Sequence, residues 1–561
     1  MTWLRFAASP QLAGIAALTA AASLGACHLI GGAGDLTFED GVGGSGAGST
    51  GTTAGGGNEG LPLGSDCSEA PDGCASGFCV DDVCCDTACE GECSTCVASG
   101  NEGTCSPDIG ASCGDTNVCD GAGVCSTGDL QWAVVGGTNM DEFPGRGAID
   151  GAALRFVGGS VTGPVEFGPL NLPGSGNNRS FVGRIDDVPE GTIEGLGRMD
   201  GTQRLEFIAR FPDGGYVVAG LATGSFDLTP AQDLDVGTKT EPVVIAFEPD
   251  GTPDWGKVIP TTPINPRVLA LAASETHVAV AFTDETTGAT RNRLTVLSRS
   301  GGGVIQDLDW DLGTTVGTGG ELTGLTFSPM GELWAAGWCL DRASIETATS
   351  QIQVGPTSDR TLPILVHYDQ GYDVPTGGAV AFGGTADTSL FAVSVSEDTI
   401  YVSGTLADGV LSQNAVEGDD PVELVADATG DDPFVLGLDE TGLARWAKSF
   451  VSNAEVEVPG LAHDDAGNVV IGGLLNLGQV TFAQTPIGST DSPTSFIVKL
   501  VPGGGVAWAR SDSNTSAEPR VNWVGIDNQG RTWVTGDSTG DLVFGQPGLG
   551  SADMMLLRFA P

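Results

Sequence analysis

GGVAW, residues 504–508, is one of four segments with the pattern Gly-x-x-x-Trp; the others are GTPDW (251–255), GLARW (442–446) and GDLQW (128–132). Three copies stand near the ends of sequence repeats, whereas the copy that ends at Trp132 stands just before the first repeat. The last repeat lacks this strand, because the sequence stops at MMLLRFAP (554–561). We expect the strand at Trp132 to complete the last repeat, which removes two sheet edges at once and closes a ring.

The repeats run from about Gly128 to Pro561 at intervals of about 55 to 70 residues. In each unit a turn leads into a short strand that usually ends in glycine, and an apolar strand follows after a variable loop. The apolar strand recurs as SFVGRID, PVVIAF, LTVLS, PILVHY, PFVLGL, SFIVKL and MMLLRF. A four-stranded unit of this kind buries its faces only against its neighbours, with tryptophans between them. The pattern predicts a seven-bladed β-propeller over residues 126–561, closed by the N-terminal strand.

Two units, HDDAGNVVIGG from His463 and DNQGRTWVTG from Asp527, resemble the bacterial propeller repeats of the SBBP type. Those repeats pair an Asp-x-x-Gly-Asn turn with a V-x-G strand and a terminal Gly-x-x-x-Trp strand. The resemblance implies a propeller and no single activity. The first, third and fourth units depart from the pattern: GLGRMD has no tryptophan, Trp310 is displaced, and none follows Tyr368. The expected number of blades is therefore seven to within one.

Composition agrees with an all-β class, because 88 Gly and 30 Pro favour short strands and tight turns over helices. At 40% hydrophobic residues the body is too polar for a membrane-spanning bundle. The net charge is −49, with 23 Lys and Arg against 72 Asp and Glu, so the chain repels phosphate backbones. Nucleic acid is excluded as an expected partner.

The N-terminus has the features of an export signal. One cation, Arg5, precedes an Ala- and Leu-rich run over residues 12–26 that is too short to span a bilayer. The run ends in LGAC (24–27), which resembles the bacterial lipobox and implies a signal peptide over residues 1–26 with a lipid-bearing Cys27. The resemblance further implies a palmitate-type membrane anchor and, with His28 rather than Asp after the cysteine, delivery to the outer membrane. An ordinary signal peptide cleaved elsewhere is the alternative.

Residues 27–66 are rich in Gly, Ser and Thr and predict a flexible tether. A cysteine-rich module follows over residues 67–125. Its twelve cysteines are Cys67, Cys74, Cys79, Cys84, Cys85, Cys89, Cys93, Cys96, Cys105, Cys113, Cys119 and Cys125. An even number in a short exported segment predicts about six disulfides, whose pairing stays open.

The competing interpretation of the cysteines is a metal or redox site, because Cys93 and Cys96 have C-x-x-C spacing. The adjacent pair Cys84-Cys85 and the absence of histidine from the module argue against it. The run CASGFCVDDVCCDTACEGECSTC resembles small cysteine-rich modules found beside repeat domains in bacterial surface proteins, which implies a rigid spacer or an interaction module. Cys339 stands alone in a strand pattern and is expected to be an inert buried side chain.

One segment matches a catalytic motif: GDSTG (536–540) has the G-x-S-x-G pattern of the hydrolase nucleophile elbow. Equivalent loops in other units read as hairpin turns, so Ser538 is expected in a turn between strands. The candidate bases His277, His367 and His463 lie in different units without a motif, and a structural role is expected for each.

Carboxylates in acidic turns are candidate ligands for Ca²⁺. Asp307, Asp309 and Asp311 alternate along the sequence, and Asp464-Asp465 form a second acidic turn. No EF-hand-type loop occurs, so solvated turns are expected, with weak Ca²⁺ binding as the open alternative. No resident metal and no cofactor are predicted.

These observations predict an outer-membrane lipoprotein, on the cell surface or the periplasmic face, whose propeller is a binding or scaffolding platform for a glycan or protein ligand. The chain is expected not to be an enzyme. One alternative is a propeller enzyme, a polysaccharide lyase or a hydrolase, in which histidines and carboxylates meet near the ring axis. The other is a purely structural envelope protein.

Overall fold

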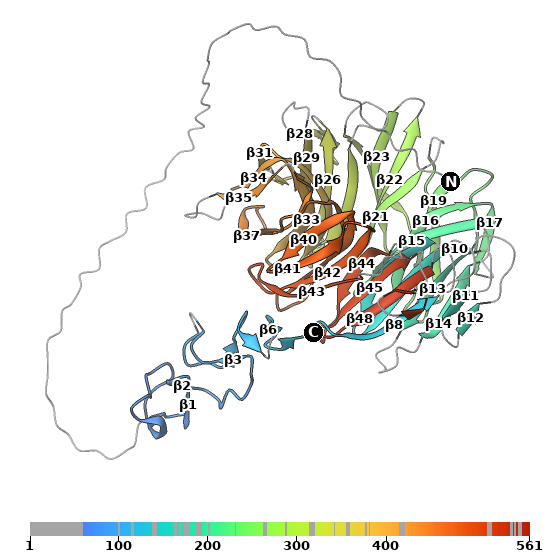
Figure 1. The fold of residues 1–561 in the computed structure, drawn as a ribbon. Coiled ribbons are helices and arrows are strands. Elements are labelled where there is room, and N and C mark those ends of the chain that lie inside the picture. Colours follow the sequence, from blue (N-terminus) through green and yellow to red (C-terminus); the bar gives the residue numbers. More distant parts are fainter. Residues whose placement is uncertain are drawn as a thin grey trace, which may run out of the picture. The chain divides into compact units, whose positions relative to one another are not determined.

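The structure is a computed structural model that describes residues 60–98, 101–113, 117–136, 143–161, 165–167, 170–172, 179–185, 193–199, 202–229, 232–261, 266–286, 289–312, 320–340, 343–354, 360–375, 378–380, 382–414, 421–427, 429–512, 519–538, 542–543, 546–547 and 553–561. The expected signal peptide, Cys27 and most of the expected tether lie outside these residues. The described part belongs to one compact unit, Glu59–Pro561. It consists of β-strands with one short 3-10 helix, η1 (Pro71–Gly73), which confirms the all-β class (Figure 1). None of its helical segments is long or apolar enough to cross a membrane.

The repeating unit is clearest in the sheet built from β38 (Glu455–His463), β39 (Val469–Asn476), β42 (Thr494–Leu500) and β43 (Val506–Ser511), which pair in that order. The two middle strands are nearly continuous apolar runs, and all seven residues of β42 are buried. Such runs form strands covered on both faces. The turn before β39 is set by Asp464, whose Oδ1 accepts the N–H groups of Ala466 and Asn468.

Seven sheets with this antiparallel order occur in the described residues, and we number them along the chain. Sheet 1 contains β9 (Phe143–Asp150), β10 (Ala153–Val161), β13 (Arg179–Ile185) and β14 (Ile193–Met199); sheet 2 contains β15 (Thr202–Arg210), β16 (Tyr216–Thr223), β19 (Glu241–Phe247) and β20 (Pro253–Val258). Sheet 3 contains β21 (Arg267–Ala273), β22 (His277–Thr286), β23 (Ala289–Ser298) and β24 (Val304–Asp311); sheet 4 contains β25 (Glu321–Phe327), β26 (Leu333–Leu340), β29 (Thr361–Tyr368) and β30 (Ala379–Val380). Sheet 5 contains β32 (Asp387–Val395), β33 (Ile400–Ala407), β36 (Asp432–Leu438) and β37 (Ala444–Ser449); sheet 6 is the one described above. Sheet 7 contains β44 (Arg520–Ile526), β45 (Thr532–Ser538), β48 (Asp553–Phe559) and β8 (Leu130–Gly136).

The variable loops of the repeats contain small hairpins, which the sequence did not predict. They lie between the second and third strands of sheets 1, 2, 5, 6 and 7: β11 (Val165–Phe167) with β12 (Leu170–Leu172), β17 (Ser225–Thr229) with β18 (Gln232–Asp235), β34 (Gly409–Gln413) with β35 (Val422–Ala426), β40 (Gly478–Phe482) with β41 (Thr485–Ser489), and β46 (Leu542–Val543) with β47 (Gln546–Pro547). β31 (Gly383–Gly384) pairs with β34. In sheet 4 the hairpin β27 (Ala343–Glu346) and β28 (Gln351–Val354) pairs with β24, which extends sheet 3 to six strands.

The last sheet is made from both ends of the repeat region. β8, which carries Trp132, pairs antiparallel with β48 (Figure 1). In this pairing Trp132 lies opposite Arg558. The strand before the first repeat therefore supplies the fourth strand of the last repeat. The first strand of each sheet contacts that of the next, and β44 of sheet 7 contacts β9 of sheet 1.

The Gly-x-x-x-Trp pattern has a packing explanation. The tryptophan at the end of one sheet lies on the glycine of the next: an added Cβ would come within 2.4 Å of Trp508 at Gly128 and within 3.0 Å of Trp446 at Gly504. Both glycines also have positive φ, +60° and +85°, which disfavours any other residue. In sheet 4, which lacks the tryptophan, Val380 lies in the same relation to Gly442.

Candidate functional site

The cysteine-rich module contains six disulfides, which confirms the predicted number. The pairs are Cys67–Cys79, Cys74–Cys84, Cys85–Cys96, Cys89–Cys105, Cys93–Cys119 and Cys113–Cys125. The two cysteines of the C-x-x-C segment bind different partners, so they do not form a redox pair. Three clusters of cysteines have the spacing of metal ligands, yet every sulfur in them belongs to one of these disulfides. Cys339 is buried and belongs to no disulfide, as expected.

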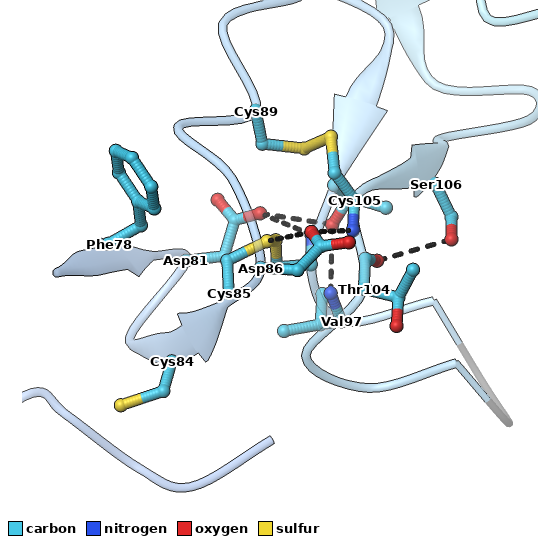
Figure 2. Close-up of a disulfide and its surroundings, with 12 residues drawn as sticks. Phe78, Asp81, Cys84, Cys85, Asp86, Cys89, Val97, Thr104, Cys105 and Ser106 are labelled. Atoms are coloured by element: carbon cyan, nitrogen blue, oxygen red, sulfur yellow. Dashed lines mark hydrogen bonds between the residues drawn. A yellow bond between two sulfur atoms is a disulfide. The ribbon is translucent and has the colours of Figure 1, made fainter. Parts of the chain in front are cut away.

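Carboxylates order the module where it lacks an apolar core (Figure 2). Asp81 Oδ2 accepts the Thr95 hydroxyl at 3.0 Å and the Cys96 N–H at 3.2 Å. Asp86 Oδ1 accepts the Cys105 N–H at 2.9 Å, beside the Cys89–Cys105 disulfide. These bonds hold the short strands β1 (Phe78–Val80), β2 (Val83–Cys85), β3 (Ser94–Thr95) and β4 (Ser106–Pro107) to one another.

The end of the module is tied to sheets 6 and 7. Lys499 Nζ donates to Asp120 Oδ2 at 2.8 Å, and both side chains are fully buried. The Gly121 N–H donates to Asn468 Oδ1 at 2.7 Å, and Lys499 also donates to the Gly530 carbonyl at 3.2 Å. Asp120 and Lys499 are 379 residues apart in sequence, and no local sequence pattern predicted this ion pair.

A pocket of about 710 Å³ lies where turns of sheets 2 to 5 meet, and we call it the turn pocket. The turn between β21 and β22 supplies Ser274 to Thr276, and the turn between β25 and β26 supplies Ser328 to Gly331. Pro212, Gln370, Val395 and the strand residues Ala273, His277 and Phe327 complete the lining. Only His277 among these residues was a candidate from the sequence. The one other sequence signal was Met330, an apolar residue in a turn, and in the structure it is 67% exposed.

The lining combines uncharged hydrogen-bonding groups with apolar surface. Its polar groups are the hydroxyls of Ser274, Thr276 and Ser328, the Gln370 amide and the His277 imidazole, and Glu275 is its one charged residue. Gln370 Nε2 donates to the Met330 carbonyl at 2.7 Å, which holds the turn before β26 in place. Such a surface suits a neutral ligand that has both hydroxyl groups and apolar faces.

His277 is held at the edge of this pocket. Its Nδ1 lies 3.1 Å from Thr276 Oγ1, and its ring meets Tyr372 edge-on at 5.6 Å between centroids. Partial burial lowers the pKa of His277, so the ring is neutral at pH 7. A neutral imidazole offers one donor and one acceptor.

The other two candidate histidines lie elsewhere. His367 in β29 stacks on Trp334 at 4.4 Å, and its Nε2 lies 3.2 Å from Glu332 Oε2. His463 ends β38, and its Nδ1 lies 2.8 Å from Ser394 Oγ in β32 of the neighbouring sheet. Burial lowers the pKa of His463, although Asp464 and Asp465 oppose the shift. The three histidines therefore have three different local partners.

The remaining candidates from the sequence are Ser538 and the alternating aspartates of β24, and each contacts other parts of the sheets. Ser538 is buried at the end of β45, where it pairs in register with Asp553. Arg293 lies among the acidic residues of β24, with contacts to Asp307, Asp309 and Asp284. A guanidinium thus already provides positive charge beside the alternating aspartates.

No family model matches this chain, and no curated protein matches it in sequence. Solved structures that resemble it include the polysaccharide lyase Uly1, at 9% identity and a TM-score of 0.37, over 74% of this chain and 90% of that one. Drosophila plexin A in complex with semaphorin 1b has 9% identity and a TM-score of 0.33, over 78% and 88%. The hemagglutinin-neuraminidase ectodomain of parainfluenza virus 5 has 7% identity and a TM-score of 0.30, over 77% and 85%. The likeness concerns an all-β, propeller-like architecture and assigns no activity.

These comparisons correct one prediction. The sequence led us to expect a protein that is not an enzyme, and the similar structures contradict that exclusion without assigning an activity to this chain. The similar structures include a polysaccharide lyase and a hemagglutinin-neuraminidase beside the binding protein plexin A. The expectation rested on the lack of a catalytic motif, and residues that the fold brings together from separate segments leave no such motif in the sequence.

Proposed function

We propose that this chain is an exported lipoprotein, anchored through Cys27, whose seven sheets form a closed β-propeller of SBBP-type repeats that binds a glycan in the turn pocket. The pairing of β8 with β48 supports the closure, as does the packing of Trp508 of sheet 6 on Gly128 just before β8. The LGAC segment supports the anchor. Six disulfides support an exported location, because such bonds persist in oxidising compartments.

The observation that carries the ligand class is the composition of the turn pocket. Hydroxyl, amide and neutral imidazole groups can hydrogen-bond sugar hydroxyls, while Phe327, Pro329 and Met330 offer apolar contact for a pyranose face. No lysine or arginine is among the described lining residues, so a neutral glycan fits better than a polyuronate.

The test is a binding screen with the full chain purified from membranes in detergent. Probes are neutral glucans, N-acetylglucosamine oligomers and, as the charged comparison, a polyuronate. Met330→Asp places a charge in the pocket at an exposed position and should weaken binding of the neutral glycan at least tenfold. Val425→Asp, at a similarly exposed site on β35, is the matched control and should bind normally. Equal affinity of both variants would contradict the proposed site.

The same screen should measure cleavage of every bound polymer. Release of fragments that Met330→Asp reduces would make the turn pocket an active site as well as a binding site. Mass spectrometry of the mature N-terminus tests the anchor: a lipid mass on Cys27, lost in Cys27→Ser, is the expected result.

A second candidate function is hydrolysis, which the Ser394–His463 contact favours. A serine hydroxyl 2.8 Å from a neutral imidazole is the arrangement of a nucleophile and its base. In the described part of the chain no carboxylate hydrogen-bonds His463, so the third group of a triad is missing. If this pair is catalytic, Ser394→Ala should reduce ester hydrolysis at least 100-fold without lowering the unfolding temperature. Unchanged turnover would leave the contact as a tie between sheets 5 and 6.

A further inference from the structure

The first strand of every sheet has the same irregularity in its pairing with the second strand. In β15, Glu206 stands between two residues whose partners in β16 are adjacent, so the first strand has one extra residue there. The other six first strands have one extra residue at the corresponding place: Gly145 with Arg146, Leu269, Thr323, Phe391, Val458 with Pro459, and Asn522. Such β-bulges re-aim side chains and are over-represented next to active sites.

The glycine that recurs in the second strand of the repeats lies against this bulge. An added Cβ at Gly220 would collide with the Arg204 carbonyl oxygen, and one at Gly536 would collide with the Arg520 carbonyl oxygen. Three more glycines have the same relation to their own first strands: Gly337, Gly404 and Gly473. The glycine therefore makes room for the bulge, and the bulge is a property of the repeat.

The bulges of sheets 1 and 2 carry opposite charges and lie side by side. An added Cβ at Gly145 would come within 2.9 Å of the Glu206 carbonyl oxygen, so β9 packs directly on β15. The Glu206 side chain is 22% exposed, and its Oε1 lies 2.5 Å from Arg204 Nε. Burial raises the pKa of Glu206, whereas the charges of Arg204, Arg146 and Arg267 lower it. Guanidinium groups from sheets 1, 2 and 3 therefore gather around one carboxylate.

Two of these three arginines have a carboxylate partner, and Arg146 does not. Arg204 pairs with Glu206, and Arg267 Nη2 lies 2.9 Å from Glu321 Oε1 in β25. Within the described part of the chain, Arg146 forms no hydrogen bond and no ion pair. Its guanidinium carbon lies over the Phe207 ring, 4.7 Å from the centroid. This contact holds the guanidinium in place without using its N–H donors.

Burial makes the unpaired charge of Arg146 unfavourable. It lowers the pKa of Arg146 to about 10, and the charge of Glu206 offsets only part of that shift. The guanidinium is still charged at pH 7. The cluster has three guanidinium groups against the carboxylates of Glu206 and Glu321, an excess of positive charge in a chain whose net charge is −49. An anionic ligand would compensate this excess.

We propose that Arg146 binds the carboxylate of a small organic acid at the bulges of sheets 1 to 3, with Arg267 as a second source of positive charge. A guanidinium can donate two parallel hydrogen bonds to a planar carboxylate, and such charge-assisted bonds are about twice as strong as neutral ones.

The proposed carboxylate site is separate from the turn pocket. The turn pocket takes Ala273 and Phe327 from the last residues of β21 and β25, whereas Arg267 and Glu321 are the first residues of the same strands. The two sites therefore lie at opposite ends of these strands, and the carboxylate site does not rest on the proposed binding of a glycan.

Calorimetry of the full chain with sodium glucuronate as the probe tests the proposal. Glucose, which has a hydroxymethyl group in place of the carboxylate, is the neutral comparison and should bind at least roughly tenfold more weakly. Arg146→Met keeps an unbranched side chain over Phe207 and should weaken glucuronate binding roughly tenfold or more. Arg267→Gln, at an exposed position, should weaken it by a smaller factor. Arg445→Met on β37 is the matched control and should bind glucuronate as the wild type does.

Three results would overturn the proposal: a wild type that binds no glucuronate at millimolar concentrations, equal binding of glucose, or a glucuronate affinity that Arg146→Met leaves unchanged. Met330→Asp separates the two sites, because it should abolish binding of the neutral glycan and keep that of glucuronate. Loss of glucuronate binding in Met330→Asp would place the acid in the turn pocket instead. The unfolding temperature of each variant shows that a loss of binding is not a loss of structure.

Discussion

The folded structures of the cysteine-rich module and of the seven sheets are stabilised by different interactions. Every buried hydrophobic side chain in the described residues 60–125 is a cysteine, whereas the sheets bury Val, Leu, Ile, Phe and Trp in extended clusters. Covalent links thus replace apolar burial in the module. Hydrogen bonds and one buried ion pair, Asp120 with Lys499, join the module to the sheets. The comparison shows that the two regions depend on different interactions and should fail under different conditions.

Reduction of the disulfides should have the largest effect. Dithiothreitol followed by alkylation should abolish hydrogen-exchange protection in residues 67–119, because a native disulfide in a small domain contributes about 2–5 kcal/mol and six are lost together. The sheets, which contain no disulfide in the described residues, should keep their β circular dichroism. Hydrogen exchange read by mass spectrometry separates the two regions. Loss of protection throughout the sheets would show that the regions are not independent.

Removing one partner of the buried ion pair should have the next largest effect. Asp120→Ala leaves the Lys499 ammonium buried without its partner and should cost about 3–5 kcal/mol at the junction, because an uncompensated buried charge is strongly unfavourable. Thermal unfolding and hydrogen exchange of residues 117–136 measure the loss.

Two further variants sharpen this prediction. Asp129→Asn is the control, because Asp129 is exposed and lies 4.0 Å from Arg510, and it should change stability by less than about 1 kcal/mol. The double variant Asp120→Leu with Lys499→Met should recover part of the stability that Asp120→Ala loses, because it removes the unpaired charge but leaves the Ala122 and Val124 N–H groups without their acceptor. A double variant less stable than Asp120→Ala would contradict the role assigned to the pair.

The strand pairing of the sheets could be predicted from the sequence more completely than the disulfide pairing of the module or the residues of the pockets. The position of Trp132 predicted the pairing of β8 with β48, because the Gly-x-x-x-Trp pattern reflects local backbone geometry and contact with an adjacent sheet. Units without the tryptophan were harder to interpret, since Val380 fills the same place in sheet 4 without a recognisable motif.

The disulfide pairing and the pockets could not be predicted for a physical reason. Twelve cysteines allow many pairings, and only the folded backbone selects among them. The turn pocket draws Ser274 from the repeat of sheet 3, and Ser328 and Gln370 from two turns of sheet 4, where each is an ordinary turn or loop residue. Asp387 of sheet 5 and Glu457 of sheet 6 likewise line one pocket because the two sheets pack together, which a repeat pattern does not encode.

The smallest predicted effect compares two buried carboxylates. Asp120 has a lysine partner, whereas Asp432, which is 1% exposed, accepts only the Ser452 N–H at 2.7 Å among its described contacts. Burial, with the charges of Asp427 and Asp431, raises the pKa of Asp432 to about 6. Since this pKa lies above the usual value of 3.8, protonation favours the folded state, and the contribution of Asp432 to stability falls as the pH rises from about 4 through 6.

Asp432→Asn keeps an acceptor for Ser452 and removes the charge, so it should raise the unfolding temperature at pH 8 by a few degrees. The difference from wild type should vanish near pH 4, where the wild-type carboxyl is also neutral. Melting curves at pH 4, 6 and 8 in EDTA make the measurement, because EDTA removes divalent cations that the Asp432 carboxylate could bind in solution. A destabilised variant at pH 8 would mean that the charged form of Asp432 has a favourable partner. Loss of a carboxylate should therefore weaken the fold where lysine neutralises it and strengthen the fold where nothing does.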